Sequence, residues 1–146
     1  MITVLDLKAE LAKLHMLQGR TPTMPAEQRK GAFANPAPYR DGGIFMAKFA
    51  GIGAWERHPQ GDEIVQIVEG STTLHLLTEA GKQSLELKAG MMAIVPQNTW
   101  HRFHAPGGVS LMTATPKPTE HLTVDIEDPR TLTDAQRAGN TEEKWR

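Results

Sequence analysis

The sequence predicts an all-β domain, and two observations lead to that prediction. Beyond Gly42 the chain consists of short apolar runs such as "EIVQIVEG", "STTLHLLTE" and "MMAIVPQN", each bounded by Gly, Pro or Asn. Six or seven such runs follow one another, at the spacing of roughly 8–12 residues that is typical of a β-sandwich or barrel. Helical periodicity is found mainly near the N-terminus, so a strand–helix alternation is not indicated.

The N-terminal region is expected to hold one amphipathic helix. Leu7, Leu11 and Leu14 recur at helical spacing, with Thr3 or Asp6 available as the cap, and the helix is expected to end near Gly19. Residues 21–41 contain four prolines and predict an irregular arm with a short strand.

The remainder of the chain divides into a barrel and an extension. We expect residues 1–41 to form the helix and arm, 42–116 the barrel, and 117–146 a C-terminal extension. In the extension, "TLTDAQRAG" predicts a short helix, and the tail "NTEEKWR" is expected to be frayed or docked on a neighbouring molecule.

Composition excludes several classes of function. The formal net charge of the 146 residues is −1 with a pI near 6.6, so no basic surface for nucleic acid is expected. The chain has no cysteine, which removes disulfides, thiolate nucleophiles and cysteine zinc sites. Neither a signal peptide nor a membrane-spanning run is recognisable, and we expect a soluble cytoplasmic protein.

One stretch, "GAWERHPQGDEIVQIVEG", places charged side chains directly before a buried strand. Successive strand residues point to opposite faces, so Glu56 and His58 share one face, and after the turn Glu63 begins another inward face. His101 shares a face with Phe103 in a later run. If these faces line one interior, two imidazoles and one or two carboxylates converge, as in a divalent transition-metal site. The other interpretation is a solvated turn beside a strand.

The spacing of these residues resembles that of the cupin superfamily. The family's first motif is G-x5-H-x-H-x3–4-E-x6-G and its second is G-x5-P-x-G-x2-H-x3-N. His58 matches the second histidine of the first motif, Glu63 its glutamate and Gly70 its last glycine, while His101 matches the histidine of the second motif. The resemblance covers residues 42–116 and implies a double-stranded β-helix, the jelly-roll barrel of this family.

Four positions depart from the family's pattern. Glu56 stands where the family has its first histidine, Asn98 replaces a glycine, and Ala105 replaces the final asparagine. The leading glycine, if Gly51 supplies it, is one residue out of register. Asn tolerates a left-handed turn nearly as well as Gly, so Asn98 does not threaten the fold. The resemblance therefore implies His58, Glu63 and His101 as metal ligands, with Glu56 as a fourth ligand, a general base or pocket lining.

Two functions from different classes follow from the resemblance. The first is a metal-dependent enzyme of oxygenase, isomerase or lyase type that acts on a small organic molecule inside the barrel. It would use one divalent transition metal (Fe, Mn, Zn or Ni), with Glu56 as the candidate catalytic proton carrier. The second is a non-catalytic module that binds or senses a small molecule. A homodimer is expected in either case. Val65 and Ile67 point into the barrel, so Ile64 and Val68 lie on its outer face, where a second copy would bury them.

Overall fold

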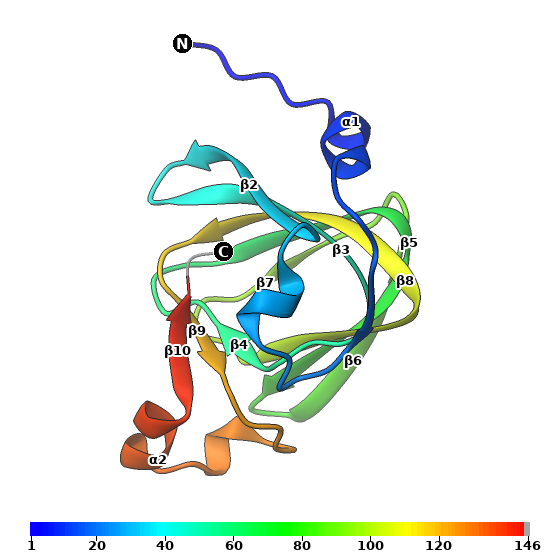
Figure 1. The fold of residues 1–146 in the computed structure, drawn as a ribbon. Helices are drawn as coiled ribbons and strands as arrows, with labels where there is room; N and C mark the ends of the chain where they lie inside the picture. The colour runs from blue at the N-terminus through cyan, green and yellow to red at the C-terminus, as the bar shows by residue number, and fades with distance from the viewer. Residues whose placement is uncertain (145–146) are drawn as a thin grey trace.

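The computed structural model describes residues 1–144 and places ten strands in one curled sheet (Figure 1). The sheet's main path runs β1-β3-β8-β4-β9-β10, with β2 paired to β3, and β6 and β7 paired to β5, which itself pairs with β8. The elements in chain order are α1 (Leu7–Ala12), β1 (Leu17–Arg20), η1 (Ala26–Arg29), β2 (Phe33–Tyr39), β3 (Gly42–Ile52), β4 (Glu56–Arg57), β5 (Glu63–Thr78), β6 (Gly81–Lys88), β7 (Met92–Val95), β8 (His101–Pro116), β9 (Thr119–Leu122), η2 (Pro129–Thr131), α2 (Asp134–Gly139) and β10 (Thr141–Lys144). The prediction of an all-β barrel is confirmed.

The two longest strands, β5 and β8, close the barrel because both bend. The first half of β5 pairs with β7 and with the end of β8, and its second half pairs with β6 and with the start of β8. The bend in β5 falls at Gly70, where φ is 75°. A Cβ built there would lie 2.3 Å from the carbonyl oxygen of Gly108. The close approach of the two bent strands therefore requires the glycine that ends the first motif.

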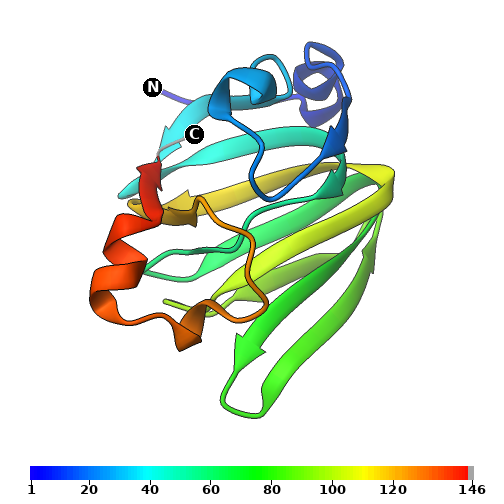
Figure 2. The same ribbon diagram turned by 60° about the horizontal axis from the view of Figure 1, so that its bottom comes forward.

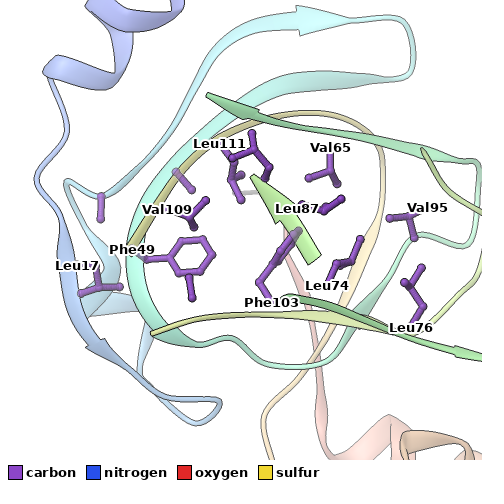
Figure 3. Close-up of a cluster of buried hydrophobic side chains, with 14 residues drawn as sticks. Leu17, Phe49, Val65, Leu74, Leu76, Leu87, Val95, Phe103, Val109 and Leu111 are labelled. Carbon is purple, nitrogen blue, oxygen red and sulfur yellow. The ribbon is translucent and has the colours of Figure 1, made fainter. Parts of the chain in front are cut away.

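Apolar side chains fill much of the barrel interior, as the alternation of the strands predicts. Figure 3 shows Phe49, Phe103, Leu74, Leu111 and Val65 pointing into the space between the two sides of the curled sheet. All five are at most 5% exposed. The charged positions at the start of β5 and β8 thus lie at one end of an otherwise hydrophobic core.

A second apolar cluster fixes the C-terminal extension to the outside of the barrel. Trp55, Trp100, Leu77 and Leu122 are buried together, with Ile126 and Leu132 packed against them. The indole nitrogen of Trp55 also donates a hydrogen bond to the carbonyl of Ile126 at 2.9 Å. Figure 2 shows the extension (orange to red) running along one side of the barrel. The predicted short helix is present as α2, which begins with a capping box between Thr133 and Gln136.

The structure corrects two expectations about the ends of the chain. The N-terminal helix is capped by Asp6, as expected, but it ends at Ala12 rather than near Gly19. Leu17 instead enters β1 and pairs in parallel with β3, where it lies opposite Phe49; strand pairing prevails here over helical periodicity. The tail was expected to fray or to dock on a neighbour, but β10 pairs with β9 of the same chain. The last two residues of that tail, 145–146, lie outside the described residues.

None of the helices within residues 1–144 has the length and apolar character needed to cross a bilayer.

Candidate metal centre

Three strands bring the predicted site residues to one end of the barrel. Glu56 begins β4, His58 follows this strand directly, Glu63 is the first residue of β5, and His101 is the first residue of β8. Glu56 lies directly opposite His101 in the antiparallel ladder, and same-face neighbours of that kind have Cβ atoms about 4.5–5.5 Å apart. The alternation of side chains along each strand therefore explains why these four groups face one another.

The four side chains converge with donor atoms that all lie within 4.8 Å of one another. His58 Nε2 is 3.1 Å from Glu63 Oε2, and His101 Nε2 is 3.2 Å from Glu63 Oε1. Glu56 Oε1 stands somewhat further away, at 3.5 Å from His101 Nε2 and 4.0 Å from His58 Nε2. Each of the four residues is at most 3% exposed. Glu63 and the two histidines thus form a tight trio, with Glu56 beside it.

In both imidazole rings, Nδ1 contacts an oxygen atom outside the cluster, and this contact orients the ring. His101 Nδ1 lies 2.8 Å from the carbonyl oxygen of Thr99, and a carbonyl can only accept, so this nitrogen carries a proton. His58 Nδ1 lies 3.0 Å from the hydroxyl of Thr119. In each ring this leaves Nε2 directed at the carboxylates. Such support of the outer ring nitrogen is usual for histidines that bind metals.

The carboxylate of Glu63 is held ionised in spite of its burial. The hydroxyl of Thr115 donates to Oε2 at 2.6 Å. Burial by itself would raise the pKa of Glu63, but the electrostatic attraction of His58 and the hydrogen bond from His101 outweigh it and lower the pKa below its ordinary value. Conversely, burial would lower the pKa of His101, but its hydrogen bonds with Glu56 and Glu63 raise that pKa to about 10.

The residues present fit a divalent metal ion. Metal–ligand bonds of about 2.1 Å would place neighbouring donors about 3.0 Å apart in octahedral geometry and about 3.4 Å apart in tetrahedral geometry. The shorter contacts between the imidazole nitrogens and the carboxylates, 3.1–3.5 Å, lie close to these values. In addition, His58 Nε2 is a buried polar atom with no hydrogen-bond partner among the described residues, since its contact with Glu63 lacks hydrogen-bond alignment. A buried atom of this kind needs a partner such as a cation or a proton.

Other residues of the two motifs occupy the positions that strand geometry predicts. His104 is three residues beyond His101 and lies opposite Thr73 in the ladder, partly exposed on the outside of the barrel. Asn98 adopts a φ of 60°, the left-handed conformation expected where the family has a glycine. Its backbone N–H donates to the carbonyl of His58 at 2.9 Å, which ties the second motif to the first.

The two motifs do not include all the residues that surround the four candidate ligands, and the sequence did not predict these neighbours. Thr119 and His121 lie on β9, within the predicted C-terminal extension of residues 117–146, and Thr115 is the penultimate residue of β8. Arg29, in the N-terminal arm, lies 3.1 Å from His121 through its Nη1 atom. The alternation of Thr119, His121 and Thr123 after Pro118 was the available indication of a further strand.

The curled sheet and its internal cluster of two histidines and two glutamates define a β-barrel with a candidate metal site, and comparison with known proteins shows which family this barrel resembles. The model of the cupin domain matches residues 45–114. This match and the fold agree in showing that residues 45–114 are similar to a cupin domain. The resemblance found in the two motifs is therefore confirmed. None of the curated proteins matches the sequence significantly.

Solved structures with a similar fold come from different organisms. A protein from Neisseria meningitidis is 23% identical with a TM-score of 0.58, covering 79% of this chain and all (100%) of its own. A cupin-2 domain containing protein from Shewanella frigidimarina is 24% identical with a TM-score of 0.51, over 58% of this chain and 79% of its own. Hydroquinone 1,2-dioxygenase from Sphingomonas sp. TTNP3 is 18% identical with a TM-score of 0.51, over 59% and 65%. At these identities the likeness concerns the fold.

Proposed function

We propose that this chain is a metal-dependent cupin that acts on a small organic molecule at the barrel end where Glu56, His58, Glu63 and His101 meet. The observation that carries the proposal is the convergence of these four buried side chains within 4.8 Å. Burying two carboxylates together costs free energy unless cations accompany them. A divalent metal would supply that charge and would also engage Nε2 of His58.

The distances suggest different roles for the two carboxylates. Glu63 contacts both imidazoles at 3.1 and 3.2 Å and would hold the metal together with His58 and His101. Two histidines and one carboxylate leave coordination positions open for a substrate. Glu56 lies further from both rings, and its Oε1 atom would either complete the site or take a proton from a substrate bound beside it. A divalent transition metal such as Fe, Mn, Zn or Ni would supply Lewis-acid or redox chemistry there.

Metal content tests this proposal directly. Protein purified without an affinity tag or chelator is expected to carry close to one equivalent of a transition metal by elemental analysis. The His58→Ala variant is expected to carry none. Because one fold neighbour is a hydroquinone dioxygenase by name, oxygen uptake and product mass spectrometry with small phenols and carboxylic acids are suitable activity readouts. A parent protein that is free of metal and does not bind any of the four candidate ions would overturn the proposal.

The apolar filling of the barrel favours a second candidate, a module that binds a small molecule without converting it. Within residues 1–144, one cluster of fourteen buried apolar side chains fills much of the interior, so the groups available for acid–base chemistry are confined to the barrel end around Glu56. Under this alternative, a ligand recovered from the metal-loaded protein would be chemically unchanged after prolonged incubation. Product formation that depends on both the metal and Glu56 would exclude it.

We further propose that a second copy of the chain covers the outer face of the barrel. Apolar side chains on this face are unusually exposed, with Ile94 at 58%, Met92 at 52% and Ile64 at 37%. Ile64 and Ile94 line a groove of about 320 Å³ together with Arg40 and Asp62. A two-fold interface brings a patch against itself, so one containing both charge signs can pair its own arginine with the partner's carboxylate.

A further inference from the structure

Strand β9 supports the candidate metal centre from a part of the chain that the family match does not include. The match ends at residue 114, whereas β9 spans Thr119–Leu122. Thr119 and His121 are both buried and lie two residues apart, so they face the same side of the strand. Thr119 contacts Nδ1 of His58, which leaves the role of His121 to be explained.

His121 lies directly opposite Glu56 in the pairing of β4 with β9. On the other side of β4, Glu56 lies opposite His101. The carboxylate therefore has a histidine on each side in a row that crosses three strands. His121 Nδ1 is 3.3 Å from Oε2 of Glu56, while Oε1 lies 3.5 Å from Nε2 of His101. The two oxygens of one carboxylate thus face two different imidazoles.

Arg29 determines which nitrogen of His121 carries the proton in the neutral ring. Its Nη1 atom lies 3.1 Å from Nε2 of His121 at hydrogen-bond geometry. A guanidinium group has only donors, so Nε2 must accept and must lack a proton. In the neutral ring the proton is then on Nδ1, the atom that faces Glu56. The 3.3 Å contact between Nδ1 and Oε2 is consequently an electrostatic contact of an N–H group with a carboxylate, without the alignment of a hydrogen bond.

We propose that His121 is a positioning residue for Glu56 and that Arg29 in the N-terminal arm sets its tautomer. With Oε2 facing His121 Nδ1 at 3.3 Å, the carboxylate presents Oε1 to the imidazoles of His101 and His58. The inference rests on the proposed function, because a fixed Oε1 matters only where a metal or substrate is bound. Loss of an outer-shell partner of a metal ligand typically changes metal affinity by about 10–100-fold.

The position of the arm explains how a residue so early in the sequence reaches the site. Arg29 is the last residue of η1, which lies in front of the barrel in the view of Figure 1. The arm and β9 enclose a cavity of about 60 Å³, lined among others by Met24, Arg29, His121 and Glu142. Arg29 and His121 therefore meet where the arm, β9 and β10 come together, outside the segment of the family match.

The experiment measures binding of Co(II) to the full-length protein by calorimetry and by visible absorption, which reports the number and arrangement of ligands. His121→Leu removes the donor, and we expect it to weaken Co(II) binding roughly 10–100-fold and to alter the spectrum. His121→Asn, whose amide N–H can replace Nδ1–H, is expected to restore most of the affinity. Arg29→Met is expected to weaken binding by a smaller factor. Lys30→Met is the matched control, because Lys30 pairs with Glu27 on the exposed surface.

The outcomes separate a failure of this inference from a failure of the proposed function. If the parent and Lys30→Met bind no Co(II), the proposed function fails and the inference fails with it. If the parent binds Co(II) and His121→Leu binds equally well with the same spectrum, the inference alone is wrong. A purely structural role for His121 would lower the melting temperature of the Leu and Asn variants without changing the spectrum, which also overturns it. Should His121→Leu not fold, the comparison of Arg29→Met with Lys30→Met decides, and equal affinities overturn the inference.

Discussion

Thr115 donates a hydrogen bond from its hydroxyl to Oε2 of Glu63 at 2.6 Å, although the two residues are 52 positions apart in the chain. The same hydroxyl lies 2.7 Å from that of Thr113. These contacts place a polar row inside the apolar barrel, directly behind the candidate metal centre. The fully buried carboxylate of Glu63 is therefore contacted by Thr115 on β8 as well as by His58 and His101.

Replacing Thr115 with valine tests how much this support stabilises the fold. Valine keeps the shape of threonine but removes the donor to a buried charged group. Hydrogen bonds to charged groups contribute about 1.5–3 kcal/mol, and we expect a loss of that size in the free energy of unfolding measured in urea. Thr73→Val is the control, since the hydroxyl of Thr73 donates to Glu86 on the surface, and its effect is expected within about 0.5 kcal/mol. Equal losses in both variants would contradict the assignment.

Glu56 is the position at which this chain departs from the family's histidine, and its charge can be removed without changing its size. Glu56→Gln is expected to weaken divalent-metal affinity by roughly 10–100-fold, as measured by calorimetry. Glu56→His should retain or improve binding, whereas His58→Ala should abolish it. The control is Glu120→Gln, because Glu120 lies on the adjacent strand and pairs with Arg57 instead of the cluster. If the Glu56→Gln variant binds as tightly as the parent, Glu56 only lines the pocket.

The metal-free protein is expected to be most stable in mildly acidic solution. The pKa of His101 is raised from 6.5 to about 10, so its stabilisation is complete below pH 6.5 and is lost as the pH rises through about 10. The pKa of Glu63 is lowered from 4.5, so its stabilisation is present above pH 4.5 and is lost as the pH falls. Both contributions are therefore largest between pH 4.5 and 6.5.

Melting temperatures of chelator-treated protein between about pH 4 and pH 10 measure this dependence. We expect a maximum in the mildly acidic window and a decline on the alkaline side, which His101→Gln should flatten. A metal has to displace the proton from Nε2 of His101, so stabilisation by added metal should instead increase with pH. A melting temperature that stays constant from neutral to alkaline pH in the chelator-treated parent would contradict the prediction.

The sequence was sufficient to predict which ionisable groups meet, but not what holds them. Strand alternation and motif spacing predicted that Glu56, His58, Glu63 and His101 converge. Such a prediction is possible because successive side chains in a strand point to opposite faces. His121 and Arg29 could not be predicted in the same way. Their contact depends on the pairing of β9 with β4 and on the path of the proline-rich arm. Neither can be predicted from the periodicity of apolar residues within one segment. The early end of α1 has the same origin, since pairing of Leu17 with β3 is a tertiary effect.

The proposed homodimer can be tested at the most exposed apolar residue of the outer face, Ile94. The parent is expected to sediment at micromolar concentration with about twice the chain mass of 16.1 kDa. Ile94→Asp places a charge in the interface and should shift the protein to the monomer, while its melting transition shows that it remains folded. Leu85→Asp is the matched control: Leu85 is 42% exposed on β6, away from the groove that Ile94 lines, and its substitution should leave the dimer intact. A parent that sediments as a monomer would show that this apolar face is not covered by a second copy.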